Sequence, residues 1–196
     1  MLLRHLANRN FEGAPASLGT DEQGRDVFAF IDGDVPVDLA LHGDETLCHA
    51  ARLIRRFHDL GAELVAESSA AAVGIETICH KDLSPCNFVF RASVPLAMID
   101  FDVAAPGSRA HDLGYAAWLW LDLGSPGIAA AEQKRRFALF IKAYGCGDTG
   151  SVLTAVLARQ AILITRGEGL GNSAMARWAA GCMKWTKRNQ RTLSGI

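Results

Sequence analysis

The chain has 196 residues, of which 49% are hydrophobic and 21% are charged, and its formal net charge is -1. This length suits one globular domain or two small lobes with a real core, and the composition excludes a disordered chain. A net charge close to zero creates no field that would draw the protein to nucleic acid or to an anionic membrane, so we expect neither as a partner. The five cysteines are scattered, and no stretch reaches the roughly 20 apolar residues that span a bilayer. We therefore expect a cytoplasmic protein with reduced thiols.

The start of the chain predicts a small part built from one helix and two strands. Leucines near the first residue indicate a short helix. Residues 14–19 and 27–31 are typical of two strands joined by a polar turn. Residues 32–36 then break the second strand and form a candidate linker. We divide the chain there into a small β part, residues 1–36, and a larger helical part, residues 37–196.

The larger part begins with a strong helical pattern. Apolar residues recur at helical spacing from Asp44 onward and predict an amphipathic helix that stops near Gly61. A second helix is expected within residues 63–72. Short apolar runs at residues 88–90 and 97–99 then predict a small β-hairpin.

Three helices are expected to fill the remainder, at about residues 126–144, 153–164 and 175–185. The glycine-rich run at residues 167–171 follows no strand, so it is expected to be a loop between helices rather than a phosphate cradle. The four tryptophans of the chain all lie in this half, and we expect them to pack its core: Trp118, Trp120, Trp178 and Trp185.

The polar stretch before the second hairpin has the pattern H-x-D-x-x-x-x-N, formed by His80, Asp82 and Asn87. Asp100 and Asp102 follow after the hairpin. Phosphoryl transfer explains this combination, because Mg²⁺ prefers hard oxygen ligands and a carboxylate must take the proton of the acceptor hydroxyl. A loop followed by a hairpin can bring Asn87 and Asp100 to one ion while Asp82 faces the acceptor. A structural alternative, in which Asp82 and Asn87 only hydrogen-bond a turn, stays open.

Other chemistries fit this segment less well. Cys79, His80 and Cys86 could suggest zinc, but the first two are neighbours and no second ligand pair follows at the usual spacing. The chain also has no G-x-S-x-G nucleophile turn.

The motifs of residues 80–90, 99–107 and 112–118 resemble those of the aminoglycoside phosphotransferase and choline kinase family, which has a protein-kinase-like fold. The resemblance is most specific between Ile78 and Trp118. It implies an α+β fold with a truncated small β N-lobe and a mainly helical C-lobe that contains a catalytic loop and a short β-hairpin.

The resemblance also implies roles for single residues. Asp82 would be the catalytic base, and His80 would brace the loop. Asn87 and Asp100 would bind Mg²⁺, with Asp102 as an auxiliary ligand. In addition, Asp112 would anchor the loop from the following segment.

The implied nucleotide is ATP or GTP. Residues 32–36 would be the hinge that contacts its base, so Asp32 and Gly33 join Asn87 as nucleotide-binding candidates. The family usually has Gly where this chain has Lys81, and we expect this lysine side chain to point to water.

Kinases of this type also use a glycine-rich hairpin and a strand lysine to hold the phosphates. Before Asp32 the chain has no lysine, so we expect it to start after the first three strands of the small lobe. Two functions follow: a kinase for a small hydroxylated substrate, or a catalytically weak or inactive truncated kinase-like protein that binds a small molecule or a partner chain. The unpaired strand edge predicts a homodimer or another cover.

The acceptor is not decided by these motifs. Aminoglycosides are polycationic and would need an acidic site. Four acidic residues could contribute to such a site or be scattered surface charges: Asp122, Glu132, Asp148 and Glu168.

Overall fold

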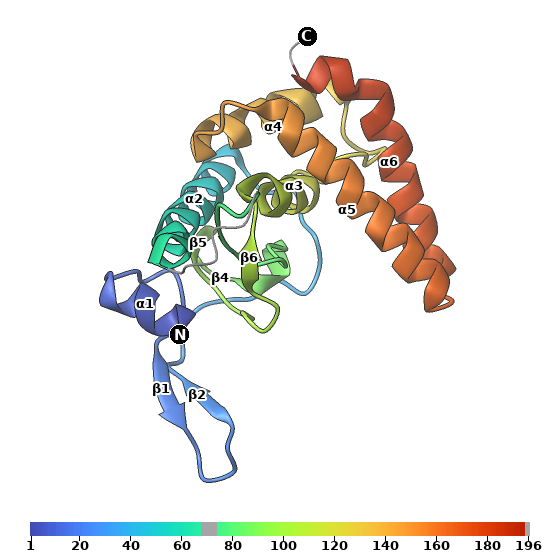
Figure 1. The fold of residues 1–196 in the computed structure, drawn as a ribbon. Helices are drawn as coiled ribbons and strands as arrows, with labels where there is room; N and C mark the ends of the chain where they lie inside the picture. Colours follow the sequence, from blue (N-terminus) through green and yellow to red (C-terminus); the bar gives the residue numbers. More distant parts are fainter. Residues whose placement is uncertain (68–73, 195–196) are drawn as a thin grey trace.

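The computed structural model describes residues 1–67 and 74–194. The chain begins with helix α1 (Leu2–Asn8), which packs against the long helix that follows, and with the antiparallel strands β1 (Ser17–Thr20) and β2 (Asp26–Phe28). The predicted short helix and hairpin are confirmed, although β2 ends three residues earlier than expected. This hairpin projects from the helical body (Figure 1). Every residue of both strands is exposed, so the hairpin buries no apolar face of its own.

Helix α2 (Asp44–Glu67) buries an apolar face that includes Leu47, Ile54 and Phe57. The prediction that it stops near Gly61 is wrong, because the helix continues for six residues beyond that glycine. A Cβ atom at Gly61 would lie 2.6 Å from the Thr77 hydroxyl, so glycine is needed for close approach to the next strand rather than as a helix stop.

The separate helix predicted within residues 63–72 is likewise wrong where it can be checked. Residues 63–67 continue α2, and residues 68–72 lie outside the described residues.

Two short antiparallel ribbons follow α2. Strand β3 (Thr77–Cys79) pairs with β6 (Ala105–Gly107), and β4 (Phe88–Arg91) pairs with β5 (Val94–Met98). The β4–β5 hairpin was predicted and is confirmed, with a tighter turn than expected. The β3–β6 ribbon was not predicted, because three residues per strand are too few for a periodic signal. Between β3 and β4 lies a 3-10 turn, Pro85–Asn87.

Four helices complete the chain: α3 (Arg109–Trp120), α4 (Ala130–Tyr144), α5 (Thr149–Gly169) and α6 (Ser173–Ser194). The prediction of three was wrong because α3 is buried almost all round and therefore shows no amphipathic period. It lies at the centre of the body and packs on α5, which runs beside α6 (Figure 1). Helix α4 begins four residues after the expected Pro126, and two of the glycines expected in a loop, Gly167 and Gly169, end α5.

The tryptophans are mainly core residues, as predicted. Trp118 and Trp120 are 1% and 0% exposed, and the Trp120 indole N–H donates to the carbonyl of Leu83 at 3.1 Å. Trp178 is 38% exposed and stacks on Trp118, with 4.9 Å between ring centroids. Trp185 is partly buried against the core. Among the described residues, no helix has the length and apolar character needed to cross a membrane.

Candidate active site

The loop that follows β3 is held by one buried carboxylate. Asp112, which is 0% exposed in the first turn of α3, accepts hydrogen bonds from the backbone N–H of His80 and of Lys81, both at 2.8 Å. The structure therefore places Asp112 as the expected anchor. Because the two N–H groups belong to neighbouring residues, their bonds to the two carboxylate oxygens fix the orientation of the chain just before Asp82.

A buried histidine holds the anchor in turn. The Nε2 atom of His58 lies 2.9 Å from a carboxylate oxygen of Asp112, and its Nδ1 atom lies 2.8 Å from the hydroxyl of Tyr144. Because a carboxylate only accepts, Nε2 of His58 carries a proton and donates it to Asp112. Burial alone would raise the pKa of Asp112, but the hydrogen bonds from His58 and the loop hold it below its ordinary value. Asp112 is therefore charged and fully hydrogen-bonded.

His80 braces the second half of the site. Its ring is buried, its Nε2 lies 3.0 Å from the carbonyl oxygen of Ile99, and it packs against Phe101 at 4.6 Å between ring centroids. Burial lowers the pKa of His80 below its ordinary value, so the ring is neutral and donates from Nε2. The ring connects the loop to the residue that precedes Asp100, which is the bracing role expected from the sequence.

A backbone hydrogen bond ties Asn87 to the residue before Asp100. The backbone N–H of Ile99 donates to the Asn87 carbonyl at 2.9 Å, so the residue before Asp100 is tied directly to Asn87. The Asn87 side-chain N–H donates to the carbonyl of Asp82 at 2.9 Å, and this bond does not use the amide oxygen, Oδ1. Asp100 holds a left-handed backbone, with φ of 64°, and its residue is exposed.

These residues fit Mg²⁺ as the ion that the fold implies. One amide oxygen and one carboxylate are hard ligands, and Mg²⁺ usually keeps water and nucleotide phosphates as its other ligands. In residues 1–67 and 74–194, no three His, Cys, Asp or Glu side chains cluster closely enough to hold a metal ion by themselves. The donor set is therefore suited to an ion that arrives with a nucleotide, rather than to zinc.

Two residues near Asp82 were not found by sequence reasoning. Burial, together with the charge and a hydrogen bond of Asp82, raises the pKa of Tyr115 to about 12, so its neutral phenol faces the Asp82 carboxylate. The guanidinium of Arg159 lies 4.0 Å from the centroid of the Tyr115 ring and donates to the carbonyl of Lys81 at 3.1 Å. Tyr115 lies within the motif at residues 112–118 but was given no role, and Arg159 comes from α5, which carries no such motif.

A cleft of about 420 Å³ lies between the projecting hairpin and the β4–β5 ribbon. Three of the predicted residues line it: Gly33, Asp100 and Asp102. Gly33 has φ of 152°, and a Cβ atom there would collide with the carbonyl oxygen of Phe90. The neighbouring Asp34 exchanges two backbone hydrogen bonds of 2.8 Å with the same residue, so the linker is tied to β4.

The structure places Asp32 differently from the other candidates. Its side chain is 85% exposed and lies 3.3 Å from the guanidinium of Arg91, and Asp32 is not among the residues that line the cleft. Apolar residues form most of the lining, including Phe28, Phe30 and Val89. This cleft combines an apolar surface with the Asp100 carboxylate, which is the composition expected of a small-molecule site.

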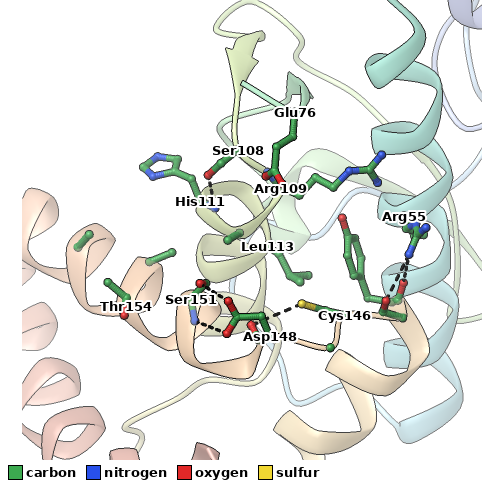
Figure 2. Close-up of a pocket in the computed structure, with 16 residues that line it drawn as sticks. Arg55, Glu76, Ser108, Arg109, His111, Leu113, Cys146, Asp148, Ser151 and Thr154 are labelled. Atoms are coloured by element: carbon green, nitrogen blue, oxygen red, sulfur yellow. Dashed lines mark hydrogen bonds between the residues drawn. The ribbon is translucent and has the colours of Figure 1, made fainter. Parts of the chain in front are cut away.

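A larger cavity, of about 730 Å³, lies elsewhere. Figure 2 shows it between α2, the start of α3 and the loop that leads into α5, with Arg55 and His111 at opposite ends. Asp82, Asn87 and Asp100 do not line it. We therefore place the reaction centre by its donor groups rather than by cavity size.

Residues 62–145 match the model of the phosphotransferase enzyme family. A trifolitoxin immunity protein of Rhizobium leguminosarum bv. trifolii is 32% identical over 139 residues, which is 65% of this chain and 53% of that protein. An uncharacterized protein of Deinococcus radiodurans is 32% identical over 120 residues, which is 57% of this chain and 34% of that protein. The chain thus spans about half the length of the first relative and about a third of the second.

Two solved structures are similar over nearly the whole chain. The GDP complex of aminoglycoside 2'-phosphotransferase-IIIa matches with a TM-score of 0.57 at 13% identity, covering 95% of this chain and 80% of that chain. The apoenzyme of macrolide 2'-phosphotransferase MphH from Brachybacterium faecium matches with a TM-score of 0.53 at 16% identity, covering 93% and 77%. At these identities the likeness concerns the fold, and it confirms the predicted kinase-like α+β class.

Proposed function

We propose that this chain, a kinase-like phosphotransferase by its family segment at residues 62–145 and by its fold, transfers the γ-phosphoryl group of ATP or GTP to a hydroxyl group of a small molecule. One observation carries the proposal. The buried Asp112 carboxylate and the Asn87 side chain together set the backbone on both sides of Asp82, while Asn87 is tied to the segment of Asp100. The similar aminoglycoside 2'-phosphotransferase was solved as a GDP complex, which supports nucleotide use.

In this proposal Asp82 is the base. Its residue is partly exposed, so an acceptor can reach the carboxylate, and Tyr115 offers it a hydrogen bond that directs it. The carboxylate orients the acceptor hydroxyl and takes its proton as the oxygen bonds to phosphorus. Positioning of this kind, rather than covalent chemistry, is what a phosphotransferase must supply.

Asn87 and Asp100 would hold Mg²⁺, with Asp102 near them at the cleft. A bound Mg²⁺ neutralises the charge of the β- and γ-phosphates. Gly33 and the apolar wall that includes Phe30 and Val89 would receive the base, because these residues line the same cleft as Asp100.

The proposal is tested first by calorimetry of ATP and GTP binding with and without Mg²⁺. Nucleoside diphosphate release is then followed with a panel of hydroxylated acceptors. Asp82→Asn is expected to lower kcat by about 10²–10⁴-fold while the nucleotide Kd stays unchanged. Asp100→Asn is expected to abolish the effect of Mg²⁺ on nucleotide binding.

The matched control is Glu168→Gln, which removes an exposed carboxylate at the end of α5 and should change neither quantity. Full activity of Asp82→Asn would overturn the assigned base. Absence of Mg²⁺-dependent nucleotide binding in the unaltered chain would instead support a catalytically inactive kinase-like protein.

A further inference from the structure

Two cationic residues, Lys81 and Arg159, are connected to the segment of Asp82. Lys81 precedes Asp82 directly, and Arg159 from α5 reaches over the Tyr115 ring to donate to the Lys81 carbonyl at 3.1 Å. Both charges act on His111, since burial, then the charge of Arg159 and, to a smaller extent, that of Lys81 lower the pKa of His111. Arg159 and Lys81 therefore bring positive charge to the side of the loop that faces α3 and α5, where Asp112 is the opposing carboxylate.

Neither cation is neutralised by a carboxylate. In the part of the chain that the structure describes, no Asp or Glu oxygen lies within 4.0 Å of the charged groups of Lys81 or Arg159. A guanidinium has five N–H donors, and the bonds of Arg159 to the Lys81 carbonyl and to the Tyr115 phenol leave others available. Both residues are partly exposed, so an anion from solvent can reach them.

Three of the four acidic residues that could have served a polycationic acceptor are engaged or distant. Asp148 accepts from the backbone N–H of Ser151 at 3.0 Å and caps α5. Glu132 is paired with Arg135 at 2.7 Å. Glu168 lies nine residues after Arg159 in α5, about 13 Å further along the axis at 1.5 Å per residue. These three carboxylates therefore do not form an acidic surface around Asp82.

The backbone conformation of Lys81 is a second indication that this residue has a functional role. Its φ is 68°, a left-handed conformation that costs a non-glycine residue about 1–2 kcal/mol. Such a cost is concentrated at functional sites, where a particular side chain is needed in a particular place. The chain keeps a lysine side chain beside Asp82 in spite of this cost.

The cavity of Figure 2 approaches the same place along two helices. His111 and Ala155 line it, and Tyr115 and Arg159 lie four residues further on, on the same faces of α3 and α5. A molecule bound beside Asp82 can therefore extend along this pair of helices.

We propose that the acceptor of the reaction carries a carboxylate or phosphate group, and that Arg159 and Lys81 bind this anion while a hydroxyl of the same molecule meets Asp82. This inference rests on the proposed function. Arginine is suited to the task because its planar fork matches carboxylate and phosphate oxygens in pairs. The acceptor oxygen bonds to the γ-phosphorus, the bond from that phosphorus to the β–γ bridging oxygen breaks, the proton passes to Asp82, and the nucleoside diphosphate leaves.

The anion site is tested without knowing the acceptor. Binding of inorganic phosphate to the full chain is measured by calorimetry, with Mg²⁺ and saturating ADP or GDP present to occupy the nucleotide cleft. Arg159→Gln is expected to weaken phosphate binding at least 10-fold, whereas Arg166→Gln, an exposed cation two turns further along α5, leaves it unchanged. Arg159→Lys should recover most of the phosphate binding, because it restores the positive charge. The glutamine of Arg159→Gln can still donate to the Lys81 carbonyl, so the loss of binding in that variant reports the loss of charge.

Acceptor preference gives the second readout. We expect kcat/KM to be highest for the anionic probes gluconate and glucose 6-phosphate, lower for glucose and lowest for kanamycin. A chain that prefers kanamycin, or that binds phosphate equally well with Arg159→Gln, overturns the inference. So does an Arg159→Gln variant that loses nucleotide rather than phosphate affinity, because the cation would then serve the nucleotide.

The two proposals fail in different ways. Mg²⁺-dependent nucleotide binding without a phosphate site at Arg159 removes the inference and keeps the proposed function. A phosphate site that depends on Arg159, in a chain that binds no nucleotide, removes the proposed function and keeps the anion site.

Discussion

Replacing Asp112 by alanine should destabilise the whole chain. The change removes an acceptor that satisfies three buried or partly buried donors: Nε2 of His58 at 2.9 Å and the backbone N–H groups of His80 and Lys81, each at 2.8 Å. Hydrogen bonds to a charged group contribute about 1.5–3 kcal/mol each, and removal of one partner from a buried charged pair costs about 3–5 kcal/mol. Partial relaxation and penetration of water limit the sum, so we expect a loss of about 3–5 kcal/mol.

Urea unfolding followed by tryptophan fluorescence measures this loss. In a chain of this length each kcal/mol lowers Tm by about 2–4 °C, so the expected shift is about 6–20 °C. Asp32→Ala is the control, because this exposed carboxylate pairs only with the exposed Arg91 and should contribute less than about 1 kcal/mol. If Asp112→Ala proved as mild as the control, the anchor would not hold the loop as described.

The destabilisation by Asp112→Ala should also depend on pH. The pKa of Asp112 is lowered in the folded chain, so its contribution is fully present above the ordinary pKa of about 3.9 and is lost as pH falls through the lower folded value. The difference in unfolding free energy between the unaltered chain and Asp112→Ala should therefore be constant above about pH 5 and shrink below about pH 4. A difference that grows on acidification would contradict a charged Asp112.

Three further changes test other parts of the fold. Gly61→Ala should lower the free energy of unfolding by about 1–3 kcal/mol, because its Cβ would overlap β3. Gly181→Ala, with nothing within 4 Å, should instead stabilise α6 by about 0.5–1 kcal/mol. Equal effects of the two changes in urea unfolding would refute the close packing at Gly61. Lys81→Gly should raise stability by about 0.5–1 kcal/mol, the relief of left-handed strain less the entropy cost of glycine, and an unchanged or lower Tm would argue against strain. Because the edge of β1 is exposed, we expect a homodimer, measured by sedimentation, that Thr20→Pro weakens. A clean monomer in which the hairpin is ordered would count against this expectation.

The arrangement of the loop could be predicted because its members are close in sequence. His80, Asn87 and Asp100 are separated by one turn and one hairpin, so a local pattern was enough to bring them together. The long-range partners could not be predicted in the same way. Tyr115 reaches Asp82 from α3, and Arg159 reaches the Lys81 carbonyl from α5, so these contacts depend on the packing of α3 on α5.

The errors in the predicted fold have one physical origin. Glycine at position 61 looked like a helix stop, yet its lack of a side chain serves contact with β3. Helix α3 lacked a period because Trp118, Trp120 and their neighbours are buried on nearly every side. In both places tertiary packing, which is not visible in a short window, decides what the local residues mean.

The structure also bears on whether the loop residues merely hold a turn. Asn87 does hold one, since its side-chain N–H donates to the Asp82 carbonyl, and that bond leaves the oxygen of the amide free. Asp82 is different, because no backbone N–H of residues 1–67 or 74–194 donates to its carboxylate, and the group beside it is the phenol of Tyr115. A buried carboxylate such as Asp112 costs several kcal/mol unless it is fully hydrogen-bonded, and an apolar residue would close an ordinary turn without that cost. We propose that Asp112 is present to hold the backbone before Asp82 in one orientation, as a positioned base would need.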